Sequence, residues 1–76
     1  MENRDAIRQY LLETDLDFRQ WVTDHRKLNQ ESDVLAAQVI PTPLLEAALQ
    51  RIKRRKLLIR DRIERRIAEV MSHVTS

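Results

Sequence analysis

Apolar and basic residues alternate with the period of an α-helix over residues 49–70, LQRIKRRKLLIRDRIERRIAEV. Apolar side chains recur at every third or fourth position, and the positions between them carry mostly Arg and Lys. The chain contains no Gly that would weaken such a helix. With about 3.6 residues per turn, this spacing gathers the apolar side chains on one side. The pattern therefore predicts a long amphipathic helix that packs against a partner.

A short helix is predicted near the N-terminus. Ile7, Tyr10 and Leu11 have helical spacing, so we expect a helix over about residues 4–13. Asn3 precedes this segment and has a side chain suited to an N-cap.

A second helix is predicted over about residues 16–39. The carboxylate of Asp15 can cap it, and Asp17 lies near the positive end of the helix dipole. From Phe18 onward the contact positions advance alternately by three and four residues, the heptad spacing of a helix that pairs with another helix. We call these contact positions the seam. On this helix the seam comprises Phe18, Trp21, His25, Leu28, Ser32, Leu35 and Val39.

Two prolines predict a turn after the second helix. Pro41 and Pro43 each lack a backbone N–H, and each pushes the preceding residue out of the α region. Thr42 can cap a third helix over about residues 43–73, with Pro43 at its first position, where helices favour proline. A turn of about three residues, 40–42, makes the two long helices antiparallel neighbours. We therefore expect an all-α fold, a coiled-coil-like antiparallel helical hairpin with a short N-terminal helical segment.

The seam of the third helix predicts the register of the hairpin. Folding about the turn places Leu35 opposite Leu49 and Trp21 opposite Ile63. The whole seam on this helix comprises Leu45, Leu49, Ile52, Lys56, Ile59, Ile63, Arg66 and Val70.

Charged residues beside the seam agree with this register. It places Asp24 near Arg62 and Glu31 near Arg55, and both contacts are attractive, whereas Asp17 meets Glu69 unfavourably near the open end. Exposed ion pairs contribute about 0–1 kcal/mol each, so these pairs favour the register without holding the fold.

Polar residues occupy four seam positions, His25, Ser32, Lys56 and Arg66. Each weakens the apolar contact and helps to fix the register, and the long stems of Lys56 and Arg66 can lie on apolar surface with their charges in water. For His25 we expect a structural role. No second His, Cys or carboxylate stands at ligand spacing, so we expect no metal site.

Leu57 and Leu58 lie away from the seam on the third helix and would be exposed in an isolated hairpin. Two neighbours could cover them. One is the N-terminal segment with Ile7, Tyr10 and Leu11; the other is a second copy of the chain in a four-helix arrangement. Burial in self-association is the interpretation that we favour, although scattered exposed Leu residues also occur without a partner.

The length of 76 residues leaves room for one small domain, 1–76. The chain has no Cys, and no apolar run is long enough for a signal peptide or a transmembrane helix, so we expect a cytoplasmic protein. Charge is unevenly distributed: residues 1–38 carry eight acidic and five basic side chains, and residues 39–76 carry four acidic and nine basic ones. The two halves can attract each other, or the basic half can bind an anionic partner.

Enzymatic function is not expected. Without Gly the chain cannot form a P-loop, a dinucleotide-binding turn or a nucleophile elbow, and its two His lie far apart in sequence. Two or three short helices also enclose little concave volume. We therefore expect no catalytic residues and no cofactor.

Nucleic-acid binding is the main alternative to a protein-interaction function. No aromatic residue is interleaved among the basic ones for base stacking, and no helix-turn-helix spacing precedes them. A role at a membrane surface would need the same seam that the partner helix needs. The candidate phosphate-binding residues are Arg51, Lys53, Arg54, Arg55, Arg60, Arg62 and Arg65.

Residues 53–63, KRRKLLIRDRI, together with Phe18, His25 and Leu28 upstream, resemble the YdcH-like family of small, uncharacterised bacterial proteins. The usual family form is an aromatic residue, a His with a Leu three positions later, a turn, and then LKKxKLxLKDEI. The chain is identical or alike at Ile52, Lys53, Arg54, Lys56, Leu57, Ile59, Arg60, Asp61 and Ile63.

The chain also departs from the family form. Leu16 stands where the family usually has Pro, Ser32 replaces an apolar residue, and Pro-Thr-Pro replaces a Gly-rich or polar turn. Asp24 and Arg62 stand where the family usually has Lys and Glu, so the charges are exchanged at two positions that the hairpin places in contact. The resemblance implies a helical hairpin without an assigned activity. We therefore expect a protein-interaction or self-assembling module.

Overall fold

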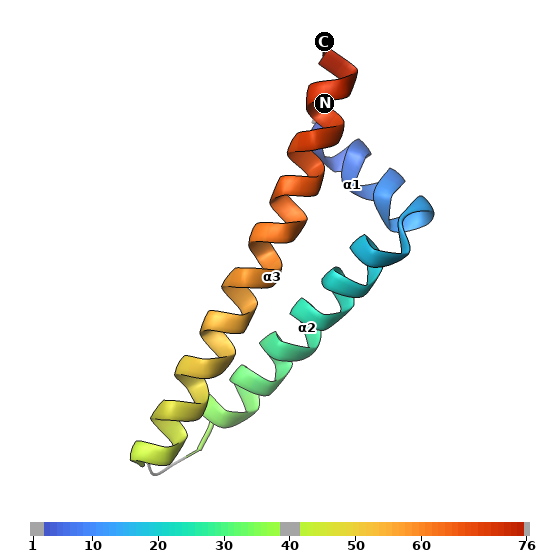
Figure 1. The fold of residues 1–76 in the computed structure, drawn as a ribbon. Helices are drawn as coiled ribbons and strands as arrows, with labels where there is room; N and C mark the ends of the chain where they lie inside the picture. Colours follow the sequence, from blue (N-terminus) through green and yellow to red (C-terminus); the bar gives the residue numbers. More distant parts are fainter. Residues whose placement is uncertain (1–2, 39–41, 76) are drawn as a thin grey trace.

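The computed structural model describes residues 3–38 and 42–75. These residues form three helices, α1 (Asn3–Thr14), α2 (Leu16–Ala36) and α3 (Pro43–Thr75). Figure 1 shows α2 and α3 running in opposite directions as a hairpin, with α1 folded back between the start of α2 and the last turns of α3. The described residues contain no strand. The all-α fold predicted from the sequence is confirmed.

The helix boundaries differ from the predicted ones by a few residues. Asn3 is the first residue of α1 rather than the residue before it. α2 ends at Ala36, short of the predicted residue 39, because the chain tightens there and the N–H of Gln38 donates to the carbonyl of Leu35 at 3.1 Å. Residues 39–41 lie outside the described part of the chain, so the seam position Val39 and most of the predicted turn at 40–42 cannot be compared.

Side-chain caps begin the two long helices at the predicted places. The carboxylate of Asp15 accepts a hydrogen bond from the N–H of Phe18 at 3.1 Å. The hydroxyl of Thr42 accepts one from the N–H of Leu45 at 3.1 Å, and Pro43 is the first residue of α3. Each cap satisfies one of the N–H groups that a helix start leaves without a partner.

A sharp corner at Asp15 separates α1 from α2. The N–H of Asp15 donates to the carbonyl of Leu11 at 2.8 Å. The guanidinium of Arg19 in the first turns of α2 then donates to the carbonyls of Leu12 at 2.8 Å and Glu13 at 3.3 Å. These carbonyls would otherwise lack partners at the end of α1, so Arg19 fixes the direction in which α1 turns back.

One cross-helix hydrogen bond reports the register of the hairpin. The Nζ of Lys56 donates to the side-chain oxygen of Asn29 at 2.9 Å. The sequence places Lys56 opposite Leu28, the neighbour of Asn29, so the observed register agrees with the expected one to within one residue.

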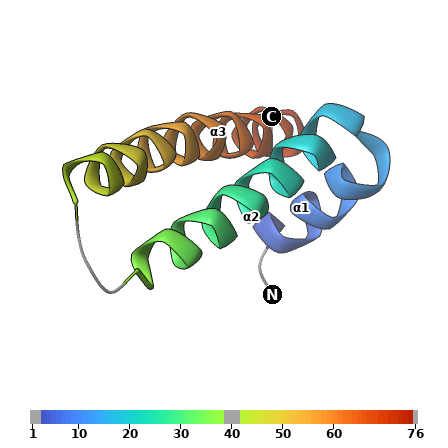
Figure 2. The same ribbon diagram turned by 90° about the horizontal axis from the view of Figure 1, so that it is seen from below.

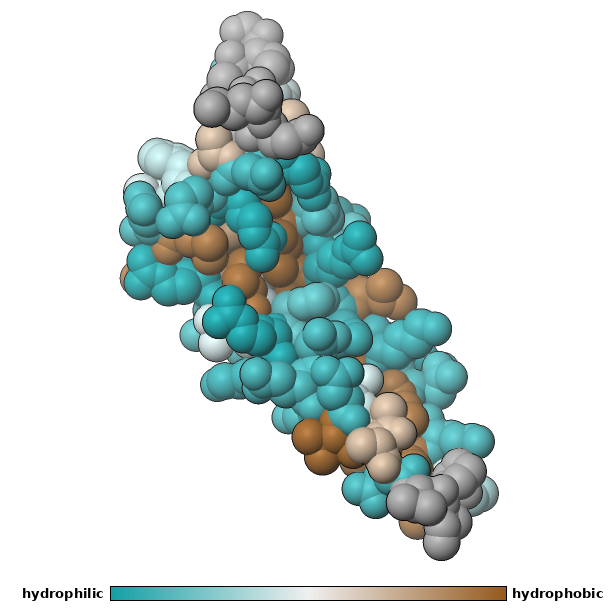
Figure 3. All heavy atoms as spheres, turned by 180° about the vertical axis from the view of Figure 1, so that it is seen from behind, coloured by the Kyte–Doolittle hydropathy of each residue, from teal (hydrophilic) through white to brown (hydrophobic). Residues whose placement is uncertain are grey.

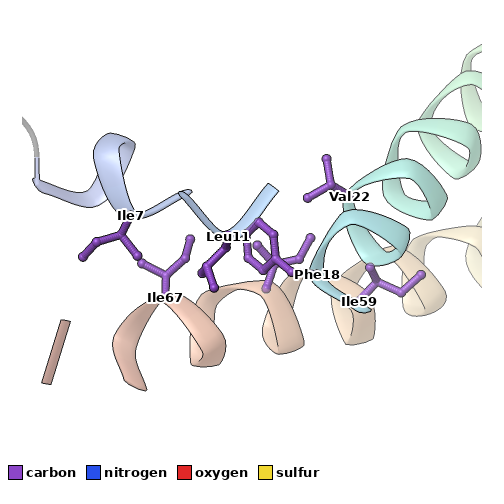
Figure 4. Packing of buried hydrophobic residues seen from close by; sticks show 7 residues of the cluster. Ile7, Leu11, Phe18, Val22, Ile59 and Ile67 are labelled. Carbon is purple, nitrogen blue, oxygen red and sulfur yellow. The ribbon is translucent and has the colours of Figure 1, made fainter. Parts of the chain in front are cut away.

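The hydrophobic core lies where all three helices meet. Figure 4 shows the side chains of Ile7 and Leu11 from α1 facing Ile67 of α3, with Phe18 of α2 beside them. Phe18 and Ile67 are the most deeply buried, at 0% and 1% exposure. The buried residues are Ile7, Leu11, Phe18, Val22, Ile59, Ile63 and Ile67.

Val22 and Ile67 are core residues that the expected seam omits. Each follows a predicted seam residue by one position, Trp21 on α2 and Arg66 on α3. Trp21 and Arg66 are only half-buried, with the Arg66 guanidinium 5.0 Å from the centre of the Trp21 ring. The predicted seam takes account of contacts between two helices only. α1 adds a third neighbour on one side of the hairpin, so the centre of the buried surface lies one residue further along each long helix.

The half of the hairpin near the turn consists of α2 and α3 alone. Its seam residues Leu28, Leu35, Leu45, Leu49 and Ile52 are half-buried. Between residues 28 and 56, none of the described side chains is buried. Figure 2 shows from below that α1 lies beside the first part of α2 and does not reach this half.

The molecule is strongly elongated, with extents of 51 × 24 × 18 Å. Its radius of gyration is 15.7 Å, compared with about 11 Å for a compact domain of this length. The accessible surface of 6194 Å² is about a quarter larger than the ~4,900 Å² typical of a compact monomer of 9.1 kDa. Much side-chain surface that a compact domain would bury therefore faces solvent.

Candidate functional site

Leu57 and Leu58, the candidate self-association residues, lie in the middle of α3 and are 55% and 66% exposed. The possibility that the N-terminal segment covers them is wrong. Ile7 and Leu11 instead pack into the core with Ile67, nearer the end of α3. From the corner at Asp15, α1 runs toward the last turns of α3 and so leaves the middle of α3 uncovered.

The two leucines belong to a continuous exposed face of α3 on the side away from the core, and Leu58 at its edge also borders a hollow that Trp21 and Asp24 of α2 line. Positions on this face follow one another at intervals of three and four residues, so they form one stripe along the helix. Arg65 and Asp61 form an ion pair within it, with 3.1 Å between Nε and Oδ2. We call this stripe the outer face. It comprises Ala47, Gln50, Arg54, Leu57, Leu58, Asp61, Arg65 and Ala68, all of them exposed.

Other exposed apolar side chains are dispersed over the molecule. Tyr10, Leu16, Val34 and Leu44 are 58%, 75%, 65% and 81% exposed and come from all three helices. Figure 3 shows apolar surface as separate patches among hydrophilic side chains on the face seen from behind. Single exposed apolar residues of this kind are common on folded proteins. Leu57 and Leu58 differ because they are adjacent and central on one helix.

The candidate phosphate-binding residues do not form one face. Arg51 and Arg55 line a hollow of about 430 Å³ between the long helices, which Asp24 and Glu31 also line. Arg55 and Arg62 border a second hollow with Trp21, Asp24 and Leu58. Lys53 and Arg60 lie on the side of α3 opposite these two hollows, and Arg54 and Arg65 belong to the outer face. The seven candidate phosphate-binding residues are therefore spread over several sides of α3.

The two predicted cross-helix charge pairs share hollows without forming ion pairs. Asp24 and Arg62 line the same hollow, as do Glu31 and Arg55. Neither pair approaches to ion-pair distance among the described residues; Asp24 instead accepts a hydrogen bond from Gln20 at 2.8 Å. The register brings these charges to the same groove, as the sequence predicts, and side-chain freedom at the surface keeps them apart.

Arg66 is held more firmly than the sequence suggests. We expected its charge to lie in water, but its Nη1 forms an ion pair with Oδ2 of Asp15. Its Nε also lies 3.7 Å from Oε2 of Glu69, and the guanidinium stacks over Trp21. The expectation fails because the corner between α1 and α2 brings the carboxylate of Asp15 to this end of α3.

A third hollow, of about 180 Å³, lies where the three helices meet, on the side of α3 opposite the first two hollows. Each helix contributes one basic side chain to it: Arg8 from α1, His25 from α2 and Arg60 from α3. The sequence does not indicate that Arg8 belongs to this site, because its place depends on how α1 folds back. The hollow is lined by Arg8, Val22, His25, Arg60, Ile63 and Glu64.

His25 is half-buried in this hollow and makes no hydrogen bond to another described residue. Burial lowers the pKa of its imidazole, and the positive charges of Lys56, Arg60 and Arg8 lower it further. Both causes disfavour the protonated ring. Glu64 also borders the hollow, but it forms an ion pair with Arg4.

In the described part of the chain, no three His, Cys, Asp or Glu side chains cluster in a way that could hold a metal ion. Nor does any described helix combine the length and apolar character that crossing a membrane requires.

Comparisons with known proteins give no relative: the chain matches no protein-family model, no curated protein and no solved structure.

Proposed function

We propose that this protein is a small, cytoplasmic, non-catalytic interaction module that self-associates through the outer face of α3. The observation that carries the proposal is the exposure of Leu57 and Leu58, 55% and 66%, side by side at the centre of a long helix. The elongated shape supports it, since a second copy can cover surface that this chain does not bury itself. A stable interface covers about 1,200–2,000 Å² in total, so a dimer has to use the outer face along much of α3 and not the two leucines alone.

Charge complementarity favours an antiparallel pairing of two copies. A two-fold axis between Leu57 and Leu58 brings these residues against the same residues of the second copy. The same axis places Arg54 of each copy near Asp61 of the other. The small side chains of Ala47 and Ala68 at the two ends of the face allow the helices to approach closely.

Sedimentation over a micromolar concentration series tests this proposal. We expect a dimer for the wild type, and monomer for Leu57→Glu combined with Leu58→Glu, because two carboxylates would be forced into an apolar contact. Leu16→Glu makes the same chemical change at a position of α2 that is 75% exposed and lies outside the outer face, and this control should remain dimeric. Circular dichroism should show similar helicity in all three. A wild type that stays monomeric throughout the series would refute the proposal.

A charge exchange tests the antiparallel arrangement separately. Arg54→Glu should weaken the dimer, since it places a Glu near Asp61 of the second copy. Combining Arg54→Glu with Asp61→Arg should restore part of the lost affinity. Failure of the double variant to recover would contradict this arrangement even if a dimer forms.

Nucleic-acid binding remains the second proposal, supported by exposed basic residues on α3 that form no ion pair with other described residues. Arg51, Arg55 and Arg62 are the best placed, but Asp24 and Glu31 line the same hollows and would repel phosphates. A mobility-shift assay at about 50 mM salt, repeated at higher salt, tests this function, because phosphate contacts weaken steeply with salt. The absence of a shift at the lower salt would end it.

Membership of the YdcH-like family also stays a proposal, supported by the sequence resemblance and by the hairpin of α2 and α3. It adds no activity to the function proposed above.

A further inference from the structure

The hollow between Arg8, His25 and Arg60 gathers basic side chains from three helices around one small space. The positive charges of Arg8 and Arg60 disfavour protonation of His25, and burial of the ring disfavours it as well. The two guanidinium groups also repel each other when no free negative charge lies between them. A negatively charged group in this hollow would therefore stabilise the fold.

The neighbouring contact between α1 and α3 shows how such charges are normally balanced. Arg4 forms an ion pair with Glu64. Four positions further along α1, one helical turn away, stands Arg8; four positions earlier on α3 stands Arg60. In the contact between α1 and α3, one helical turn therefore carries the attractive pair Arg4–Glu64. The next turn carries the repulsive pair Arg8–Arg60.

The described residues supply no unpaired negative charge to this hollow. Neither Arg8 nor Arg60 forms an ion pair or a side-chain hydrogen bond with another described residue. Glu64 is the one carboxylate among the described residues that border the hollow, and its charge is already paired with Arg4. The guanidinium donors of both arginines are therefore free to bind an external anion.

We propose that this hollow binds a small phosphate-type dianion, inorganic phosphate or a phosphate monoester, between Arg8, His25 and Arg60. Guanidinium groups present paired N–H donors that match phosphate oxygens, and a protonated imidazole adds another donor. A volume of about 180 Å³ lies below the ~300–1,000 Å³ of pockets for drug-sized ligands, so the hollow suits a small anion. The bound anion connects α1 to the hairpin. This site does not depend on self-association.

Binding and protonation of His25 are coupled. The charged groups that face its ring are Arg8 from α1 and Lys56, Arg60 and Glu64 from α3. A dianion among them offsets the positive field, so it raises the pKa of His25. By linkage, the anion binds more tightly as the pH falls through the pKa of His25.

Proton NMR of the His25 ring, followed during a titration with inorganic phosphate near pH 6.5, tests the site. The reference titration uses sodium chloride at matched ionic strength, and His73 on the last turns of α3 is an internal comparison. We expect a saturable shift of His25 and a rise of its pKa in phosphate. No shift of His25 at about 10 mM phosphate, tenfold above a millimolar Kd, would overturn the proposal. An equal shift in chloride would overturn it too.

Matched variants separate binding from folding. Arg60→Gln and Arg8→Gln should each weaken phosphate binding about tenfold or more, the loss expected for one charge-assisted hydrogen bond. Arg26→Gln removes the same charge from an exposed position that borders none of the hollows described above, and should bind as the wild type does. Arg8→Lys keeps the charge and should retain part of the affinity even if Arg8→Gln loosens α1. Equal binding by Arg60→Gln and the wild type would refute the site.

The source of the phosphate is identified by two further titrations. If glycerol phosphate binds as tightly as inorganic phosphate, or more tightly, the ligand is a phosphate monoester. If glycerol phosphate binds more weakly than inorganic phosphate, the ligand is the free ion. A short single-stranded oligonucleotide should not shift His25 at the concentrations at which phosphate does. If it acts at lower concentrations, the site as proposed is wrong and a nucleic-acid interface replaces it.

Discussion

Asp15 and Arg66 are 51 positions apart in the sequence and form an ion pair in the folded chain. The second carboxylate oxygen of Asp15 accepts the N–H of Phe18 and so caps α2. One side chain therefore starts a helix and also attaches that start to α3. Arg66 in turn stacks on Trp21, which places a cation–π contact beside the ion pair. The corner of the molecule depends on this pair.

Two substitutions of Asp15 separate its two roles. Asn caps a helix about as well as Asp, so Asp15→Asn loses mainly the ion pair, which we expect to lower the free energy of unfolding by about 1 kcal/mol. Asp15→Ala also loses the cap and should cost about 0.5–2 kcal/mol more. Urea unfolding followed by circular dichroism measures both. Asp33→Asn, at an exposed position of α2, is the control for loss of an acidic charge. Equal losses for Asp15→Asn and Asp15→Ala would show that the cap contributes nothing.

Ile67 should be among the most sensitive residues of the chain, because its side chain is 1% exposed and contacts α1. Ile67→Ala is expected to destabilise the fold by about 2–5 kcal/mol, enough to unfold a domain of this size. Ile67→Val is therefore the better measurement, with an expected loss of about 0.5–1.5 kcal/mol. Val34→Ala, at a position 65% exposed, should stay within about 0.5 kcal/mol of the wild type. A similar loss at both positions would contradict the assigned core.

Arg19 should hold the end of α1 in place through its hydrogen bonds to the carbonyls of Leu12 and Glu13. Arg19→Ala leaves these carbonyls to water, and we expect a loss of about 0.5–1.5 kcal/mol. Hydrogen exchange should become faster in the amides of α1 and change much less in the hairpin of α2 and α3. Arg26→Ala removes a basic residue from the surface of α2 and should leave exchange in α1 unchanged. Uniform acceleration in all three helices would argue against this local role.

Stability should fall as the pH is lowered, because of His25. Its pKa is lowered in the folded chain by burial and by Lys56, Arg60 and Arg8, so the unfolded chain takes up the proton first. The contribution of neutral His25 is therefore present above the unfolded pKa of about 6.5 and is lost as the pH falls below it.

Urea unfolding between pH 7.5 and 5.5, in a buffer without phosphate, measures this effect, since most carboxylates titrate below that range. His25→Gln should reduce the dependence on pH in this interval. If the variant and the wild type lose stability in parallel, another group is responsible.

The sequence by itself determines the helices of this protein. Asp15, Thr42 and Pro43 have local roles, a cap or a fixed backbone angle, and such roles are readable from neighbouring residues. The spacing of apolar residues likewise fixes which side of each long helix is buried, and the short turn makes the helices antiparallel. Lys56 and Asn29 consequently meet within one residue of the expected register.

Only the tertiary structure decides where α1 lies. The position of the core and the exposure of Leu57 and Leu58 follow from the position of α1. Ile7 and Leu11 are apolar at helical spacing, which shows that α1 packs against something but does not say against which side of the hairpin. Because α1 packs near the end of α3, the core moves onto Val22 and Ile67 and leaves Leu57 and Leu58 uncovered. The physical reason is that apolar burial has no direction, so the position of a third helix depends on which surfaces fit together in space.

Contacts between charged residues also depend on the tertiary structure. The sequence identifies the basic residues of α3, including Arg60, but it cannot bring Arg8 and His25 to Arg60 or Asp15 to Arg66. Electrostatic contacts between distant segments depend on distances that the folded backbone creates, and salt screens them beyond about 8–10 Å. The hairpin was therefore determined by the sequence, whereas the ion pair at the corner and the basic hollow between three helices were decided by the tertiary structure.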